Sequence, residues 1–428
     1  MPENGFKKTP LLRDVFTLFT GTTIAQVIPV AIQPVLRRLF TPEEFGNYAL
    51  YISIASTLIV IATMRYELAI VLPEKDKDGI NLLALSQIIS ILVCSLSFLC
   101  IIFLKPYILD FLNIEQSDSN FLYFIPLGAF LFSSYQSFNY WLTRKKAFKQ
   151  SAINKISRRS SEALIQFIQG INNIKHGLIY GDIIGRIILL FTGALQSIKK
   201  QFDFKEIKLS SVLQVARDYK DFPIYNAIPA VLNTASLMVP ILLITKLYSR
   251  EITGQVDLCV QLLGLPLSLI SASVSQVLYQ RIAEYKQKNN SIVKIYQSLL
   301  KSLLIMAFLG ILLVELFGKW GINIIFGEQW TDAGTFILIM VISYGIKFIV
   351  SPLSIILTAL DKLKALAIWQ FGYFITILTL SFLDFLDIKQ FLITYMGIDI
   401  IAYGMYLLLI NHYVVKYEKI IGRHKMES

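Results

Sequence analysis

The sequence is poor in the residues that build catalytic and metal sites. Its 428 residues include only three histidines, His176, His412 and His424, and contain no His-Glu-x-x-His or Cys-x-x-Cys spacing. These are spacings with which proteins bind zinc or form a redox-active pair. We therefore predict no metal site and no cofactor.

The cysteines and glycines give no sign of catalysis either. All three cysteines lie in apolar segments, where a thiol acts as a small hydrophobic group, so neither a disulfide framework nor a nucleophile is predicted. A Gly-Lys pair ends the segment Gly310–Lys319, but Trp320 stands where a phosphate-binding loop needs Ser or Thr, and the glycine spacing is wrong. We expect a chain that hydrolyses no ATP and is not an enzyme.

Polar stretches are scarce as well, which leaves little room for a soluble domain. Apolar residues make up 55% of the chain and the mean hydropathy is +0.60, values typical of an integral membrane protein. A span needs about 20 mostly apolar residues. We predict an all-α polytopic membrane protein with about twelve spans, at 14–36, 45–72, 79–104, 119–142, 157–171, 176–198, 222–245, 255–279, 296–317, 333–359, 365–383 and 390–415.

The distribution of Lys and Arg predicts the orientation. With the N-terminus in the cytoplasm, most of these residues fall in cytoplasmic segments, as the positive-inside rule requires, so both termini are predicted to be cytoplasmic. The net charge of +11 is attributed to this bias and to anionic lipid headgroups rather than to nucleic acid. The first span follows the N-terminal cations directly without a small-residue cleavage site, so no removable signal peptide is expected.

A short internal repeat indicates two similar halves. The run Arg38–Gly46 is echoed 208 positions later by Lys246–Gly254, with a cation, Leu, an aromatic residue, a hydroxyl, Glu and Gly kept in place in that order. Six predicted spans separate the copies, so the two lobes run in the same direction. We predict two pseudo-symmetric six-helix lobes, 1–210 and 211–428, with a ligand in the cleft between them.

The fifth span is the least apolar of the twelve. The segment 144–159 carries seven cations and 199–220 carries six, so both are predicted to be cytoplasmic and an even number of crossings must separate them. Two short spans broken at Asn172–Gly177 satisfy this requirement. A pair of re-entrant or interfacial helices satisfies it equally well.

Ionisable residues inside the predicted spans are the best functional candidates, because each costs roughly 2.5 to 3.5 kcal/mol on insertion scales and usually faces a cavity or a partner. Lys347 lies near the middle of its span, where it either lines a cavity or pairs with Asp399 or Asp257. Arg186 follows Asp182 by one helical turn, which favours a locally neutralised pair over contact with a ligand.

Other cations lie near span ends. Arg65 and Glu67 come one or two turns from the cytoplasmic end of span two, where an arginine either snorkels to the interface or contacts a ligand. The pairs Arg37-Arg38 and Arg158-Arg159 are interpreted either as headgroup anchors or as cavity residues. The set is more basic than acidic, so we predict a cationic cavity for an anion with an apolar tail, either phospholipid-like or polyprenyl-linked. The cavity is predicted to be formed by Arg65, Arg186, Lys347, Arg38 and Arg159.

Four segments carry a family resemblance. Gly21–Gln26, Pro34, Arg38–Gly46 and Arg65–Pro73 resemble the N-terminal signature of bacterial polysaccharide flippases, with Tyr279–Glu284 a weaker match. These flippases belong to the multidrug/oligosaccharidyl-lipid/polysaccharide exporter superfamily, whose multidrug exporters share the two-lobe fold. The specific motifs lie in the first 75 residues, whereas the span count and lobe arrangement resemble the family along the whole chain.

The resemblance implies a function and a place. Undecaprenyl-pyrophosphate carrying an oligosaccharide repeat would move from the cytoplasmic to the periplasmic leaflet of the inner membrane, for O-antigen or capsule assembly. In the related lipid II flippases, arginines of the first spans hold the pyrophosphate, and Arg65 best fits that role. Span one itself has no second intramembrane arginine, and in this the chain departs from that pattern. A functional link to the polysaccharide polymerase and chain-length proteins follows by the same resemblance.

Transport is expected to proceed by alternating access of the two lobes. Coupling is expected either to the membrane potential or to protons or sodium through Asp182, Glu315 or Asp399. Two other functions fit less well. A membrane-embedded glycan polymerase or ligase would need longer periplasmic loops than 105–118 and 318–332, and an ion-coupled multidrug exporter would need an acidic cavity for cationic drugs.

Overall fold

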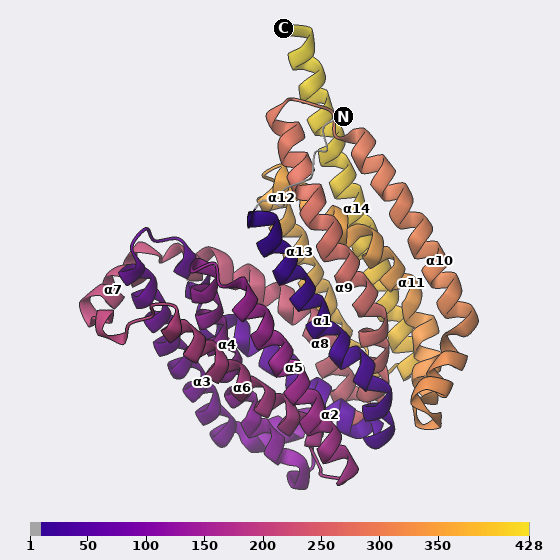
Figure 1. Cartoon of the computed structure of the whole chain (residues 1–428). Coiled ribbons are helices and arrows are strands. Elements are labelled where there is room, and N and C mark those ends of the chain that lie inside the picture. The colour runs from indigo at the N-terminus through magenta and orange to yellow at the C-terminus, as the bar shows by residue number, and fades with distance from the viewer. Residues whose placement is uncertain (1–9, 428) are drawn as a thin grey trace, which may run out of the picture. The chain divides into compact units, whose positions relative to one another are not determined.

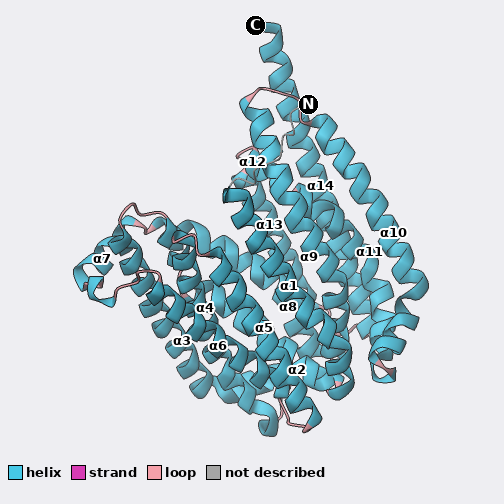
Figure 2. Cartoon of the chain, in the orientation of Figure 1, coloured by secondary structure: helices cyan, strands magenta, loops and turns pink. Residues whose placement is uncertain are grey.

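The computed structural model describes the backbone of residues 10–427 and the side chains of residues 25–116 and 118–421. Every regular element in residues 10–427 is a helix (Figure 2). The chain divides into two compact units, Met1–Lys246 and Leu247–Ser428, called unit 1 and unit 2 below. The placement of a lobe boundary at residue 210 stays a prediction.

Unit 1 is built from α1 to α8 (Figure 1). Within it, α6 contacts both α4 and α5, while α4 also contacts α2 and α3 and α5 contacts α1. The α-helices of unit 1 are α1 (Pro10–Leu39), α2 (Pro42–Ala62), α3 (Asp76–Leu112), α4 (Phe124–Arg144), α5 (Phe148–Ile171), α6 (Gly177–Lys199), α7 (Leu209–Asp218) and α8 (Ile228–Leu247).

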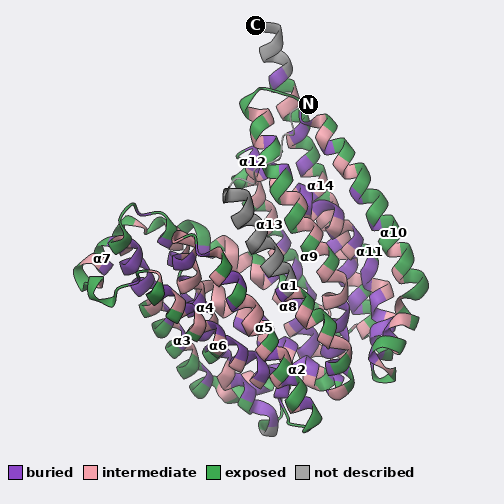
Figure 3. Ribbon diagram, in the orientation of Figure 1, coloured by how far each residue is buried: buried purple, intermediate pink, exposed green. Residues whose placement is uncertain are grey.

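Unit 2 is organised around one buried helix. Its α-helices are α9 (Arg250–Gln287), α10 (Val293–Phe326), α11 (Thr331–Leu353), α12 (Ile355–Ala359), α13 (Leu363–Leu378) and α14 (Ile388–Glu427). Helix α11 contacts α9, α10 and α14, so its side chains are largely buried, whereas α10 presents an exposed apolar surface (Figure 3). An apolar surface of this length is suited to lipid.

The predicted polytopic all-α membrane fold is confirmed. Among the described residues, nine helical segments are long and apolar enough to cross a membrane, and they coincide with nine of the predicted spans. The other three predicted spans, 14–36, 119–142 and 157–171, fall on α1, α4 and α5. In α4 and α5, Ser, Gln, Asn and charged residues interrupt the apolar pattern, which is expected of helices that face protein or a hydrated cavity.

The prediction of one continuous span over 45–72 is wrong beyond residue 62. Helix α2 ends at Ala62, and Met64 and Arg65 both adopt left-handed backbone conformations, with φ of 49° and 64°. A short 3₁₀ helix, Tyr66–Val71, follows. Two successive left-handed residues that are not glycine cannot continue an α-helix, and each costs about 1–3 kcal/mol.

The two copies of the sequence repeat adopt the same local structure. Thr41 caps the N-terminus of α2, with its hydroxyl accepting the Glu44 amide at 3.3 Å, and its own amide donates to the Glu44 carboxylate at 2.9 Å. Ser249, at the corresponding position, caps α9 by accepting the Ile252 amide at 3.1 Å. Each cap satisfies backbone donors that a helix start leaves free.

Candidate functional site

A row of glycines on α6 brings α5 close enough to form a polar site. Gly181 and Gly185 face α5, where a Cβ at Gly181 would lie 2.3 Å from Cγ of Gln166 and one at Gly185 would lie 3.0 Å from Cβ of Glu162. Small residues four apart allow two helix backbones to approach in a membrane. Asp182 and Arg186, next to these glycines, are thereby held against the charged part of α5.

Asp182 is the centre of this site. Its carboxylate lies 2.5 Å from Nε of Arg186 and accepts a hydrogen bond from Nη2 of Arg158 at 3.0 Å. The hydroxyl of Tyr51, on α2, donates to it at 2.8 Å. Arg186 in turn donates to the carbonyl of Gly128 on α4 at 3.0 Å. The Asp182 carboxylate therefore links α2, α5 and α6, and Arg186 connects it to α4.

A second carboxylate extends the site along α5. Nη1 of Arg159 donates to Glu162 at 2.9 Å, and the hydroxyl of Tyr48 donates to Glu162 at 3.3 Å. Nε of Arg158 lies 3.6 Å from the same carboxylate. We call the three arginines and two carboxylates the α5–α6 ion cluster: Arg158, Arg159, Arg186, Glu162 and Asp182.

The α5–α6 ion cluster is buried and positively charged overall. Both carboxylates and Arg186 are almost inaccessible, and the side chain of Arg158 is only 12% exposed. Arg158 is therefore a partner of Asp182 rather than a headgroup anchor. The side chain of Arg159 is 34% exposed, so Arg159 is the arginine of this cluster that an external anion can reach most easily.

Unit 2 contains a separate ion pair between α11 and α14. The ammonium of Lys347 contacts the carboxylate of Asp399, one of the two partners predicted for it. The other, Asp257, accepts from Gln261 at 2.7 Å. Ser343 and Tyr373 donate to Asp399 at 3.1 Å and 2.7 Å. Each unit thus holds a buried carboxylate that pairs with a cation and accepts from a tyrosine.

Aromatic rings surround the Lys347 ammonium. Its nitrogen lies 5.0 Å from the ring centroid of Tyr344, 5.5 Å from that of Tyr403 and 5.7 Å from that of Tyr395. Rings at this range attract a cation by their quadrupole, most strongly where water is excluded. These contacts and Asp399 hold the Lys347 ammonium in place within unit 2.

Arg65 and Glu67 meet at the turn that follows α2. Nη1 of Arg65 lies 3.5 Å from the carboxylate of Glu67, which also accepts from the hydroxyl of Thr63. Burial raises the pKa of the Glu67 carboxyl, and the contacts with Thr63 and Arg65 oppose that effect. The side chain of Arg65 is 26% exposed, so it remains accessible to an anion.

The other charged residues named from the sequence lie on α1 and α10. Arg38, at the end of α1, and Glu315, on α10, are exposed. Arg37 is fully buried, donates to Gln33 at 3.1 Å and lies 3.8 Å above the ring of Phe45, so the anchor interpretation is wrong for it. Among the described residues, no group of three His, Cys, Asp or Glu side chains could hold a metal ion.

Sequence reasoning missed the tyrosines and Glu162 of these sites. Tyr48 and Tyr51 contact buried carboxylates 114 and 131 positions away, and Tyr373 contacts Asp399 from the preceding α-helix. Nothing in the neighbourhood of these tyrosines predicts the contacts. The glycine spacing of four in 177–185 is the signal that predicts close packing of α5 and α6, and hence the contact of Arg158 with Asp182.

Comparison with known proteins assigns the chain to a family. A sequence model of the family described as "Polysaccharide biosynthesis protein" matches residues 35–335. The chain belongs to this family. None of the curated proteins matches the chain.

Solved structures show which proteins share the fold of this polysaccharide biosynthesis protein. An inward-facing multidrug resistance MATE transporter of the MOP superfamily is 10% identical with a TM-score of 0.71, the match covering 94% of this chain and 99% of that one. The lipid II flippase MurJ, in an inward closed conformation, is 14% identical with a TM-score of 0.69, covering 96% and 92%. The family match confirms the predicted resemblance to a polysaccharide family. The two solved structures, a transporter and a flippase, show the fold that this chain shares with them.

A third structural match is to a transporter noted for the polarity of its binding pocket. A MOP superfamily transporter from Pyrococcus furiosus, described as having a binding pocket of reverse polarity that suggests a different function, is 10% identical with a TM-score of 0.60. The match covers 94% of this chain and 95% of that one. At this identity it establishes the shared two-lobe fold alone.

Proposed function

We propose that this protein is a flippase that moves a polyprenyl-pyrophosphate-linked oligosaccharide across the bacterial inner membrane, from the cytoplasmic to the periplasmic leaflet. We further propose that the polyprenyl carrier is undecaprenyl-pyrophosphate and that the oligosaccharide is a repeat unit of O-antigen or capsular polysaccharide. Both termini are proposed to be cytoplasmic, on the distribution of Lys and Arg. The polysaccharide polymerase and chain-length proteins are the proposed functional partners.

The observation that carries the proposal is the excess positive charge of the α5–α6 ion cluster. Two carboxylates neutralise two of its three arginines, and Arg159 keeps a third of its side chain accessible while bonded to Glu162. A guanidinium presents several donors in a fork that matches phosphate oxygens. Membership of a polysaccharide biosynthesis family supports a phosphate that carries a glycan.

The cluster also suggests how binding affects the protein. A pyrophosphate at Arg159 competes with Glu162 for the same guanidinium, and Glu162 also accepts from Tyr48 of α2 and lies 3.6 Å from Arg158. Substrate would therefore loosen contacts that join α5 to α2. A differential interaction of this kind is what a ligand needs to shift a two-state transporter.

Surface-glycan staining of a deletion strain tests the proposal. Complementation with Arg159→Ala is expected to abolish staining, and Arg159→Lys to restore it in part, because lysine keeps the charge and loses the fork. Lys149→Ala is the matched control, since Lys149 is an exposed cation at the start of the same helix. Each variant is checked for its amount in the membrane.

Three results would count against the proposal. Full staining with Arg159→Ala would remove the residue from the substrate path, and equal loss with Lys149→Ala would show a general effect of charge on α5. Hypersensitivity of the deletion strain to cationic drugs, with normal surface glycan, would favour the multidrug exporter instead. Arg65→Ala and Lys347→Ala extend the series to the other proposed cations, of which Arg65 is the more accessible.

A further inference from the structure

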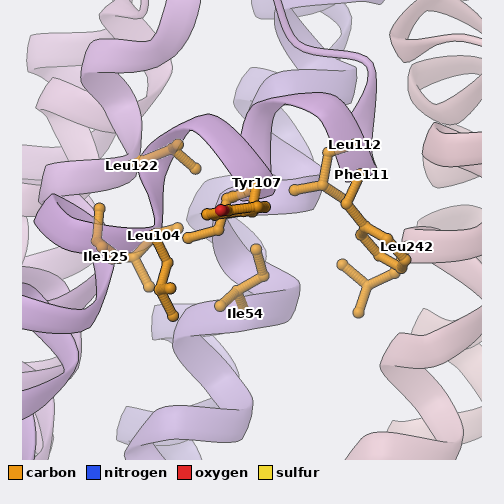
Figure 4. A pocket seen from close by; sticks show the side chains of 10 residues that line it. Ile54, Leu104, Tyr107, Phe111, Leu112, Leu122, Ile125 and Leu242 are labelled. Carbon is orange, nitrogen blue, oxygen red and sulfur yellow. The ribbon is translucent and has the colours of Figure 1, made fainter.

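Unit 1 contains a pocket that the proposed transport path does not use. It lies along the C-terminal third of α3 and has a volume of about 510 Å³, within the range of about 300–1,000 Å³ found for small-molecule sites. Side chains from α2, α3, η2 (Gln116–Tyr123), α4 and α8 surround it (Figure 4). Its principal lining residues are Ile54, Ile101, Leu104, Tyr107, Phe111 and Leu242.

The lining is almost entirely hydrocarbon. Every side chain around the pocket is aliphatic or aromatic, and the Tyr107 hydroxyl is the one polar group among them. Leu104, Tyr107 and Phe111 are about half exposed or more, so the pocket is open along the apolar face of α3. Water gains no hydrogen bonds in such a site, and an empty one would forfeit dispersion contacts. A hydrocarbon chain suits it.

Two cations stand at the edge of this pocket. The ammonium of Lys246 lies 4.2 Å from the ring centroid of Phe111, and the Lys246 carbonyl accepts from the side chain of Asn113 at 2.8 Å. The ammonium of Lys105, the residue after Leu104, lies 4.9 Å from the ring centroid of Tyr123. Both lysines are half-buried, and neither has a carboxylate within ion-pair distance among the described residues.

We propose that the pocket binds one acyl chain of an anionic phospholipid, with Lys246 holding the phosphate. An uncompensated ammonium at the margin of the hydrocarbon region attracts an anionic headgroup. The positive charge of Lys105 adds to the attraction that Lys246 exerts on the headgroup. The proposed ligand is a lipid that stays bound to the protein, so this inference does not depend on the identity of the transported substrate.

The length of the pocket fits a phospholipid rather than a long isoprenoid. From Ile101 to Leu112 the helix rises about 16 Å at about 1.5 Å per residue. One leaflet of the hydrocarbon core is about 15 Å deep. The pocket thus has the depth of a single leaflet, which one ordinary acyl chain fills.

Native mass spectrometry of the full chain, released from detergent, tests the assignment. The probes are phosphatidylglycerol and phosphatidylcholine with identical acyl chains, offered in equal amounts. We expect phosphatidylglycerol to be preferred and Lys246→Gln to weaken its binding about fivefold, the factor for one lysine near a lipid surface, without affecting phosphatidylcholine. Lys319→Gln is the matched control, since Lys319 is an exposed lysine near the end of α10.

A second variant fills the pocket itself. Leu104→Trp is expected to reduce the binding of both lipids, and because Leu104 is 49% exposed the substitution should leave the fold intact; Leu242→Trp repeats the test from α8. Equal binding of the two lipids, no effect of Lys246→Gln, or unchanged binding in both tryptophan variants would overturn the proposal. Displacement of phosphatidylglycerol by equimolar polyprenyl phosphate would overturn the choice of a phospholipid.

Discussion

The hydroxyl of Tyr51 donates a 2.8 Å hydrogen bond to Asp182, across 131 positions of the sequence and between two membrane-spanning helices. The same carboxylate pairs with Arg158 and Arg186. Asp182 is therefore the shared counter-charge of two buried arginines in unit 1.

Asp182→Asn should destabilise unit 1 strongly, because it leaves Arg158 and Arg186 buried without their shared counter-charge. Breaking a buried pair in this way costs about 3–5 kcal/mol. A lower unfolding temperature of the purified protein in detergent would show it. Asp110→Asn, an exposed aspartate near the end of α3, is the control and should leave the unfolding temperature unchanged.

The Lys347–Asp399 pair should behave as a coupled unit. Lys347→Met and Asp399→Asn should each destabilise unit 2, because each leaves one buried charge alone, whereas the double variant removes both charges and keeps an acceptor for Tyr373. We expect a coupling free energy of about 1–3 kcal/mol from a double-mutant cycle of thermal unfolding. Additive losses would mean that the two residues act separately.

The helix caps at the two repeats should contribute unequally. Thr41→Ala removes a capping box and Ser249→Ala a single cap, and each should lower the free energy of unfolding by about 0.5–2 kcal/mol, with Thr41→Ala the larger loss. Thr376→Ala serves as the control, since that hydroxyl bonds to the Gly372 carbonyl within α13 and caps nothing. Equal losses in all three variants would contradict the capping role.

Transport should respond to the membrane potential. An inside-negative potential contributes about 2.3 kcal/mol per charge per 100 mV, which drives an anionic headgroup outward and returns an empty cationic cavity inward. Collapsing the potential with valinomycin and potassium should slow the flipping of lipid-linked glycan in vesicles. Unchanged flipping rates would contradict coupling to the potential and favour coupling to protons or sodium. Of the three acids proposed for that role, Glu315 is the exposed one.

Most helix positions could be predicted from hydropathy, and the one clear error has a physical cause. Tyr66–Val71 is as apolar as the span before it, so composition alone extends the span to residue 72. The chain turns instead at Met64 and Arg65, where no glycine or proline marks the change. Left-handed backbone at such residues is imposed by surrounding contacts, which include the Thr63–Glu67 hydrogen bond.

The partners of buried charges were only partly predictable. Asp182 and Arg186 lie one turn apart on one helix, so their pairing follows from helical geometry. The sequence offered two acidic partners for Lys347, Asp399 and Asp257. The structure pairs Lys347 with Asp399 because α11 packs against α14, a contact to which Ser343 contributes a hydrogen bond. A single sequence does not show which helices pack against each other.

The caps at Thr41 and Ser249 also constrain how the chain is made. Only two residues separate α1 from α2, and two separate α8 from α9. A turn this short holds no loop, so the second helix of each pair must re-enter the bilayer on the side where the first one left it. We therefore expect the two helices of each pair to insert together as a hairpin, the first hairpin ending near Ala62 and the second near Gln287.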